Sequence, residues 1–118
     1  MTGSDLFVSS QDGEWTNPEP GVKRRILAYL DEMMMVEVAF DKGATGAQHS
    51  HPHVQASYVA EGCFEVTIDG VTKTLGQGGS FIVPPNLLHS VKALEKGRLI
   101  DAFTPHRAEF LVGTAAEC

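Results

Sequence analysis

The sequence has 118 residues and a mass of 12.7 kDa, which is the size of a single domain. Apolar residues make up 42% and charged residues 20% of the chain, as is typical of a soluble globular protein. Nine basic and fifteen acidic residues give a net charge of −6, which argues against a nucleic-acid-binding surface. The longest apolar stretch, Met33–Phe40, is far shorter than the roughly 20 residues of a membrane span. We therefore expect neither nucleic acid nor a membrane as a partner.

Cysteine usage indicates the compartment. Cys63 and Cys118 are the only two cysteines, and neither belongs to a CxxC pair. The N-terminal residues lack the basic start and apolar core of a secretory signal. We therefore expect a cytoplasmic protein with free thiols, in which Cys63 packs in a strand as a small apolar side chain.

The first segment of the chain is predicted to differ from the rest. Residues 1–22 are polar, contain Pro18 and Pro20 and show no hydrophobic period, so they are predicted to form an irregular arm. Residues 23–118 are predicted to form one domain of short strands separated by Gly, Pro or Asp. Asp69-Gly70 is typical of a two-residue hairpin turn. The predicted strands cover residues 24–30, 33–40, 54–60, 64–68, 71–75, 80–83, 87–94, 98–104 and 108–113, with a loop over residues 41–47.

These eight or nine short strands predict an all-β fold without an amphipathic helix. In the strand over residues 33–40, Met34, Val36, Val38 and Phe40 form one apolar face, and Glu37 lies on the other. An antiparallel barrel or jelly roll is the expected architecture, because closure removes exposed strand edges.

Histidines are concentrated in one segment. Three of the five fall within residues 49–53 (HSHPH), and His89 follows a turn on a separate predicted strand. His49 and His51 are two positions apart, so on a strand they point to the same face, and such a pair of neutral imidazoles is a good ligand set for Zn, Ni, Cu, Mn or Fe. The alternative is adventitious metal capture by an exposed loop. The fold decides between the two by whether it brings His89 close.

The spacing around these histidines resembles the first sequence motif of the cupin family. That motif runs Gly, five residues, His-x-His, three or four residues, Glu, six residues, Gly. Here the same spacing joins Gly43, His49, His51, Gln55 and Gly62, with Gln55 in place of Glu.

The second cupin motif runs Gly, five residues, Pro-x-Gly, two residues, His, three residues, Asn. It is matched by Gly78, Pro84, Asn86 and His89, and Ala93 stands at the final position. Asn86 replaces Gly, and Asn tolerates the left-handed backbone conformation that Gly would serve.

The resemblance implies a cupin double-stranded β-helix, a jelly-roll barrel, with a metal held by His49, His51, Gln55 and His89. Gln in place of Glu removes a negative charge, so the metal keeps its full double charge and is a stronger Lewis acid. The change also disfavours a non-haem iron oxygenase, which usually offers two His and one carboxylate. We expect one divalent metal ion per chain, with Ni, Zn or Mn preferred and Fe as a further candidate.

Residues 58–62 (YVAEG) and 99–107 (LIDAFTPHR) resemble the pectin-degradation (KdgF-like) family of cupins. That family opens 4,5-unsaturated uronates, released by lyases from pectin or alginate, and ketonises them to linear 5-keto-4-deoxyuronates. The resemblance implies functional roles for Asp101, Phe103 and Arg107. Asp101 can act as general acid–base, Phe103 can offer a flat wall to a sugar ring, and Arg107 can bind the substrate carboxylate.

Other interpretations compete with this one. Asp101 could be a surface residue on an edge strand, Phe103 a core residue and Arg107 a solvated charge. Tyr58 and Trp15 are interpreted as packing residues, and the role of His53 is left open. A non-catalytic sugar- or metal-binding cupin module and an O₂-dependent cupin dioxygenase are the alternative functions. The enzyme interpretation implies a small anionic sugar as the substrate, and we expect a homodimer.

Overall fold

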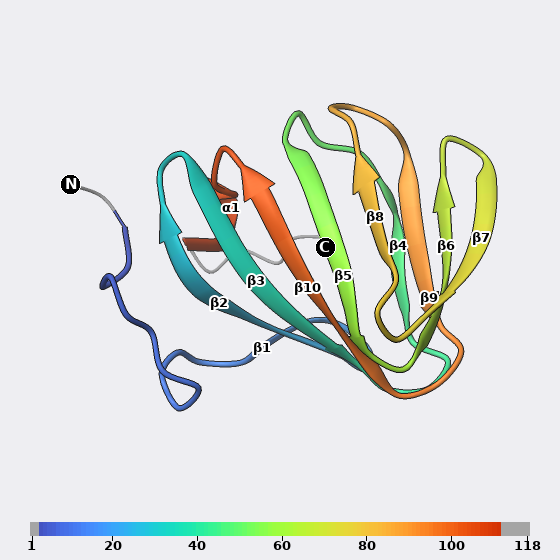
Figure 1. Ribbon diagram of the computed structural model, residues 1–118, viewed down its shortest axis with the longest axis horizontal. Coiled ribbons are helices and arrows are strands. Elements are labelled where there is room, and N and C mark those ends of the chain that lie inside the picture. The colour runs from blue at the N-terminus through green and yellow to red at the C-terminus, as the bar shows by residue number, and fades with distance from the viewer. Residues whose placement is uncertain (1–2, 112–118) are drawn as a thin grey trace.

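The computed structural model describes residues 3–111, which fold into two antiparallel β-sheets that face each other (Figure 1). Phe40 and Phe64, from opposite sheets, meet edge to face with ring centroids 5.1 Å apart, so the sheets share one core. This arrangement confirms the predicted all-β jelly-roll class.

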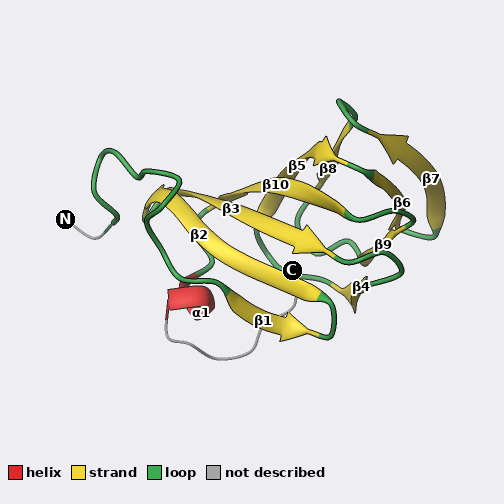
Figure 2. Cartoon of the chain, turned by 90° about the horizontal axis from the view of Figure 1, so that it is seen from below, coloured by secondary structure: helices red, strands yellow, loops and turns green. Residues whose placement is uncertain are grey.

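The larger sheet has six strands, and the smaller has four. The larger runs in the order β1 (Thr16–Glu19), β2 (Val22–Leu30), β3 (Met33–Phe40), β10 (Gly97–Thr104), β5 (Val54–Glu61) and β8 (Ser80–Val83). The smaller runs in the order β4 (Thr45–His49), β9 (His89–Ala93), β6 (Cys63–Ile68) and β7 (Val71–Gly76). The short helix α1 (Ala108–Leu111) follows β10 and lies near β1 and β2 (Figure 2).

The N-terminal arm is more ordered than predicted. Thr16–Glu19 forms β1, which pairs with β2, although residues 1–22 were expected to be irregular. Pro18 is compatible with this strand because β1 is the edge of its sheet, where a missing backbone N–H costs little.

Two further predictions assigned the wrong type of secondary structure. The predicted loop over residues 41–47 ends in β4, whose pairing with β9 outweighs the weak strand propensity of Thr45–His49. The strand predicted over residues 108–113 begins instead as α1, and residues 112 and 113 lie outside the described range. Ala, Glu and Leu in α1 are good helix formers, and Phe110 is the one residue of α1 that is buried.

Two turns agree with their sequence signals. Asp69 and Gly70 have φ values of 49° and 81°, as the predicted hairpin turn requires. Gly62 carries the chain from β5 of the larger sheet to β6 of the smaller one with φ of 90°. A Cβ there would lie 2.7 Å from the Lys96 carbonyl oxygen, so this close crossing requires glycine.

The interior of the barrel is apolar at one end and polar at the other. Met34, Val36, Val38 and Phe40 are buried on the inner face of β3, as their alternation predicted. On β5 the buried positions become polar toward the other end, where Ser57 and Gln55 lie, and the buried Asp101 of β10 is the direct partner of Ser57.

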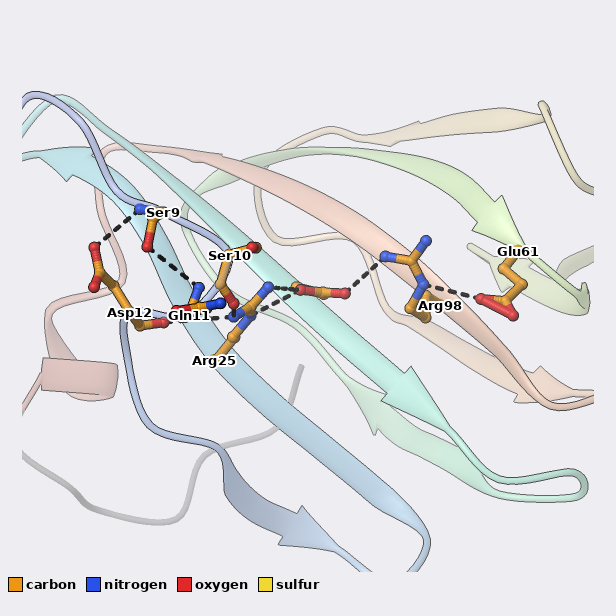
Figure 3. Close-up of polar contacts among 8 residues, drawn as sticks. Ser9, Ser10, Gln11, Asp12, Arg25, Glu61 and Arg98 are labelled. Atoms are coloured by element: carbon orange, nitrogen blue, oxygen red, sulfur yellow. Dashed lines mark hydrogen bonds and ion pairs between the residues drawn. The ribbon is translucent and has the colours of Figure 1, made fainter.

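Glu37 lies on the opposite face of β3 and holds two arginines together. Its carboxylate accepts hydrogen bonds from Arg25 at 2.8 Å and from Arg98 at 2.7 Å, and Arg98 also reaches Glu61. Arg25 in turn donates to the backbone oxygen of Ser10, which attaches the N-terminal arm to the sheet (Figure 3). Burial alone would raise the pKa of Glu37, but the hydrogen bonds from Arg98 and Arg25 hold it below its ordinary value.

No helix in residues 3–111 is both long enough and apolar enough to cross a membrane.

We expect Glu37→Gln to lower the free energy of unfolding by about 2 kcal/mol at pH 7, because two arginines lose their shared carboxylate. The expected loss of free energy is modest because Arg98 is 41% exposed, so water screens its interaction with Glu37. A carboxyl group with a lowered pKa stabilises the fold above its unfolded pKa, so this difference should shrink as the pH falls from 5 to 3. Urea unfolding across this range, with exposed Glu95→Gln as the control, measures both effects. Equal stability of Glu37→Gln and wild type at pH 7 would contradict the prediction.

Candidate metal centre

Pairing within the smaller sheet brings two histidines of distant segments together. His49 ends β4 and His89 begins β9, and the two residues are direct partners in the β4–β9 register. Their ring centroids are 4.3 Å apart. His51 follows β4, and its ring lies 4.9 Å from that of His89. The fold therefore brings His89 to the His-x-His pair, which is the condition that the sequence left open.

The three side chains, hereafter the His triad (His49, His51 and His89), form a compact group. One imidazole nitrogen from each lies within 4.8 Å of the others. The loop that follows β8 supports this arrangement, because the Asn86 N–H donates to the His51 carbonyl oxygen at 2.8 Å. Asn86 has a φ of 68°, the left-handed conformation expected where the cupin motif usually has Gly.

Backbone carbonyls select the tautomers of two of these imidazoles. Nδ1 of His49 lies 2.7 Å from the Ala47 carbonyl, and Nδ1 of His89 lies 3.0 Å from the Leu87 carbonyl. A carbonyl oxygen only accepts, so each Nδ1 carries the proton and each Nε2 presents a lone pair. Nε2 of His89 is buried without a hydrogen-bond partner among residues 3–111. A buried lone pair of this kind suits a metal ligand.

Burial keeps two of the imidazoles, those of His51 and His89, neutral. It lowers the pKa of His51 to about 4, and the positive charge of Arg107 adds to the effect. Burial also lowers the pKa of His89. Neutral imidazole is the form that binds a metal ion, so the site holds His51 and His89 in the ligand state at neutral pH.

Gln55 adds an oxygen beside the His triad. It is buried on β5, and its Oε1 lies 3.0 Å from Nε2 of His51. Two ligand atoms at neighbouring positions around one metal ion are also about 3 Å apart, since each bond is about 2.1 Å long. Three imidazoles and one amide oxygen are therefore a donor set that fits a divalent transition metal.

A chain of buried hydrogen bonds leads from Gln55 to Asp101. Nε2 of Gln55 donates to the Ser57 hydroxyl at 3.0 Å, and that hydroxyl donates to Oδ1 of Asp101 at 2.6 Å. Ser57 and Asp101 are direct partners in the β5–β10 register. Asp101 is only 1% exposed, which excludes its interpretation as a surface residue.

Burial raises the pKa of Asp101 to about 6, although the Ser57 hydrogen bond and the Arg107 charge oppose the rise. A carboxyl group with a pKa in this range can take up and return a proton near neutral pH.

Phe103 and Arg107 lie against the same end of the barrel. Phe103 is fully buried and meets the His51 ring edge to face, with centroids 5.7 Å apart. The Arg107 guanidinium is also buried, 5.1 Å from the centre of the Phe103 ring and 4.5 Å from that of Phe110. Its Nε donates to Glu109 at 2.6 Å. Arg107 is therefore not a solvated charge, and Phe103 belongs to the core while touching the His triad.

Sequence reasoning missed Ser57 and left the role of His53 open. Ser57 could have been found from its position two residues after Gln55, on the same face of β5. His53 is buried, and its Nε2 lies 3.1 Å from the His106 carbonyl, which connects the His-x-His loop to the segment before Arg107. Tyr58 points away from the site and is 50% exposed.

Comparisons with known proteins agree with this geometry. A family model described as "Cupin domain" matches residues 36–103. The pectin degradation protein KdgF of Dickeya dadantii is 46% identical over 107 residues, which are 89% of this chain and 97% of that protein.

Solved structures give the same result. An RmlC-like cupin from Shewanella frigidimarina is 44% identical with a TM-score of 0.89, and the match covers 93% of this chain and 99% of that one. KdgF from Halomonas sp. is 37% identical with a TM-score of 0.85, and the match covers 91% of this chain and 99% of that one. The chain therefore belongs to the cupin family and is a homologue of the KdgF proteins.

Proposed function

We propose that this protein is a metal-dependent enzyme that converts 4,5-unsaturated uronates from pectin or alginate breakdown to linear 5-keto-4-deoxyuronates. Its similarity to pectin degradation proteins supports a sugar-derived substrate. The observation that carries the proposal is the buried Asp101 carboxylate, joined to the His triad through Ser57 and Gln55. A proton-transfer group thus lies beside a candidate metal site.

The His triad and Gln55 would hold one divalent metal ion, for which Ni, Zn or Mn are the preferred candidates and Fe a further one. When bound, such an ion supplies Lewis-acid polarisation of substrate oxygens. All four donors are uncharged, so nothing in the ligand set offsets the charge of the ion.

Asp101 is assigned the proton transfers. Its carboxylate takes the proton of the hemiacetal hydroxyl, the bond from the anomeric carbon to the ring oxygen breaks, and an aldehyde and an enolate form. Asp101 then returns the proton to carbon 4, and the enolate becomes the 5-keto group. Substrate and product are isomers, so no oxidant or reductant is needed, and a pKa of about 6 suits both steps.

Arg107 is assigned to the uronate carboxylate, because a guanidinium pairs with carboxylates through two parallel hydrogen bonds. Its contacts with Phe103 and Phe110 restrict the plane of the guanidinium. Phe103 would shape the wall of the site next to His51.

The enzyme is favoured over a non-catalytic module because burying a carboxylate is costly, and sugar or metal binding alone does not require it. An O₂-dependent dioxygenase is less consistent with the ligand set, since the His triad is joined by an amide rather than by a carboxylate. Oxygen consumption during turnover would identify that alternative.

We also infer that the chain forms a homodimer through the outer face of the larger sheet. A shallow hollow crosses β3, β10, β5 and β8 there, and the apolar side chains in it include Met35, Tyr58 and Ile82. Ile82 is 61% exposed, and the residues that line the hollow are all uncharged. An uncharged, shallow hollow suits self-association about a twofold axis, because it adds no repulsion between two acidic chains.

The proposed metal site predicts about one metal ion per chain in protein purified without a metal-affinity tag. His49→Ala with His51→Ala should remove it, whereas His106→Gln, outside the His triad, should not. Elemental analysis measures the content. Binding to the native state also stabilises it, by about 2.7 kcal/mol at a hundredfold excess over the dissociation constant, so a chelator should lower the melting temperature. Near-zero metal in the wild type would contradict the site.

Asp101→Asn should reduce turnover of unsaturated galacturonate by about 10²–10⁴-fold while the metal content stays unchanged. Asn has nearly the same shape but cannot exchange a proton at neutral pH. The melting temperature should hold or rise, because the variant removes a buried charge whose pKa is raised in the folded state. Loss of the substrate's absorbance measures the rate. Full activity in this variant would remove Asp101 from the mechanism, and an inactive wild type would favour the binding module.

The homodimer predicts a molecular mass of two chains by light scattering, and Ile82→Glu should convert it to one. Val71→Glu, on β7 of the smaller sheet, is the matched control because Val71 is similarly exposed. A monomeric wild type, or a dimer that Ile82→Glu leaves intact, would contradict the assigned face.

A further inference from the structure

An amide side chain can serve as an oxygen ligand only when its carbonyl faces the metal. We propose that Ser57 is a positioning residue whose hydroxyl turns the Gln55 amide so that Oε1 faces the His triad. The inference rests on the metal site of the proposed function. In this role Ser57, which is neutral and buried, sets the orientation of the neighbouring ligand Gln55.

The Ser57 Oγ–Asp101 Oδ1 distance of 2.6 Å falls in the short range typical of a hydroxyl that donates to an ionised carboxylate. A serine hydroxyl has a single proton, so the bond to Asp101 uses it. Toward any other neighbour, Ser57 can only accept.

That neighbour is Gln55. Its Nε2 lies 3.0 Å from Oγ of Ser57, and the amino end is the only part of an amide side chain that donates. The carbonyl end is therefore directed to the opposite side, where Oε1 lies 3.0 Å from Nε2 of His51. The hydrogen bonds from Gln55 to Ser57 and from Ser57 to Asp101 run in one direction. This direction determines which amide atom of Gln55 is Oε1 and which is Nε2.

With a metal ion bound, the reversed amide would be unfavourable at both ends. Its amino group would face the His triad, where it has no lone pair to offer a metal. Its oxygen would face the lone pairs of Ser57, because the Ser57 proton is held by Asp101. In a buried site, where water cannot compensate, such a mismatch is costly.

The need for Ser57 is specific to glutamine. A carboxylate at position 55 would present two equivalent oxygens, so no neighbour would have to choose between its ends. Gln55 and Ser57 lie two residues apart on the inner face of β5, and Asp101 lies opposite Ser57 on β10. The three residues therefore act as a unit.

Calorimetric titration of metal-free protein with Ni²⁺ tests this without any activity measurement. Ser57→Ala should weaken Ni²⁺ binding about 10-fold or more, as is typical when a residue supporting a ligand is lost. Ser57→Thr and Ser57→Val form a matched pair of nearly equal size, of which only Thr keeps the hydroxyl. Thr should restore binding, and Val should not. Melting temperatures of the metal-free variants check that each is folded.

The same substitution in a Gln55→Glu background separates orientation from general packing. There Ser57→Ala should leave Ni²⁺ affinity nearly unchanged, because a carboxylate needs no orientation. An equal loss in both backgrounds, or equal binding by wild type and Ser57→Ala, would overturn the role of Ser57 while leaving the metal site intact. If the wild type binds no Ni²⁺, the metal centre itself fails, and this inference fails with it.

Discussion

The register between β5 and β10 is the constraint on which the rest of the site depends. From Leu99 to Thr104 the two strands pair without interruption, so Val59 faces Leu99 in the apolar half of the barrel and Ser57 faces Asp101 in the polar half. A shift of this register by one residue would both expose Leu99 and turn Asp101 away from the interior. Because the hydrophobic core penalises such a slip, the packing that stabilises the fold also sets the distances within the site.

The polar end of the barrel is arranged so that few charges are buried there. The imidazoles of His51 and His89 are neutral, and the Nδ1 atoms of His49 and His89 are bonded to nearby carbonyls. Asp101 and Arg107 are buried charged groups at this end of the barrel, and each reduces the cost of burying the other. The buried lone pair on Nε2 of His89 has no partner among residues 3–111. Such unsatisfied groups reduce stability, and they are typical of positions kept for binding or catalysis.

Stability is also supplied far from the site. Glu37 joins Arg25 and Arg98 on the outer face of the larger sheet, and Arg25 binds the backbone of the N-terminal arm (Figure 3). This network lies on the side of β3 opposite to the core. It can therefore compensate for the cost of the polar interior without touching the residues that would meet a substrate.

The sequence by itself determined the fold class, the inner face of β3, the Asp69-Gly70 turn and a His-x-His pair on one face, because these follow from local alternation and spacing. The resemblance to known motifs added five candidate site residues, namely Gln55, His89, Asp101, Phe103 and Arg107. Only the tertiary structure decided that His89 meets His49, that Ser57 connects Gln55 to Asp101, and that Thr16–Glu19 and Thr45–His49 are strands while Ala108–Leu111 is a helix. These outcomes depend on pairing between segments distant in the chain, and local propensity at Pro18 or Gly46 is too weak to predict them.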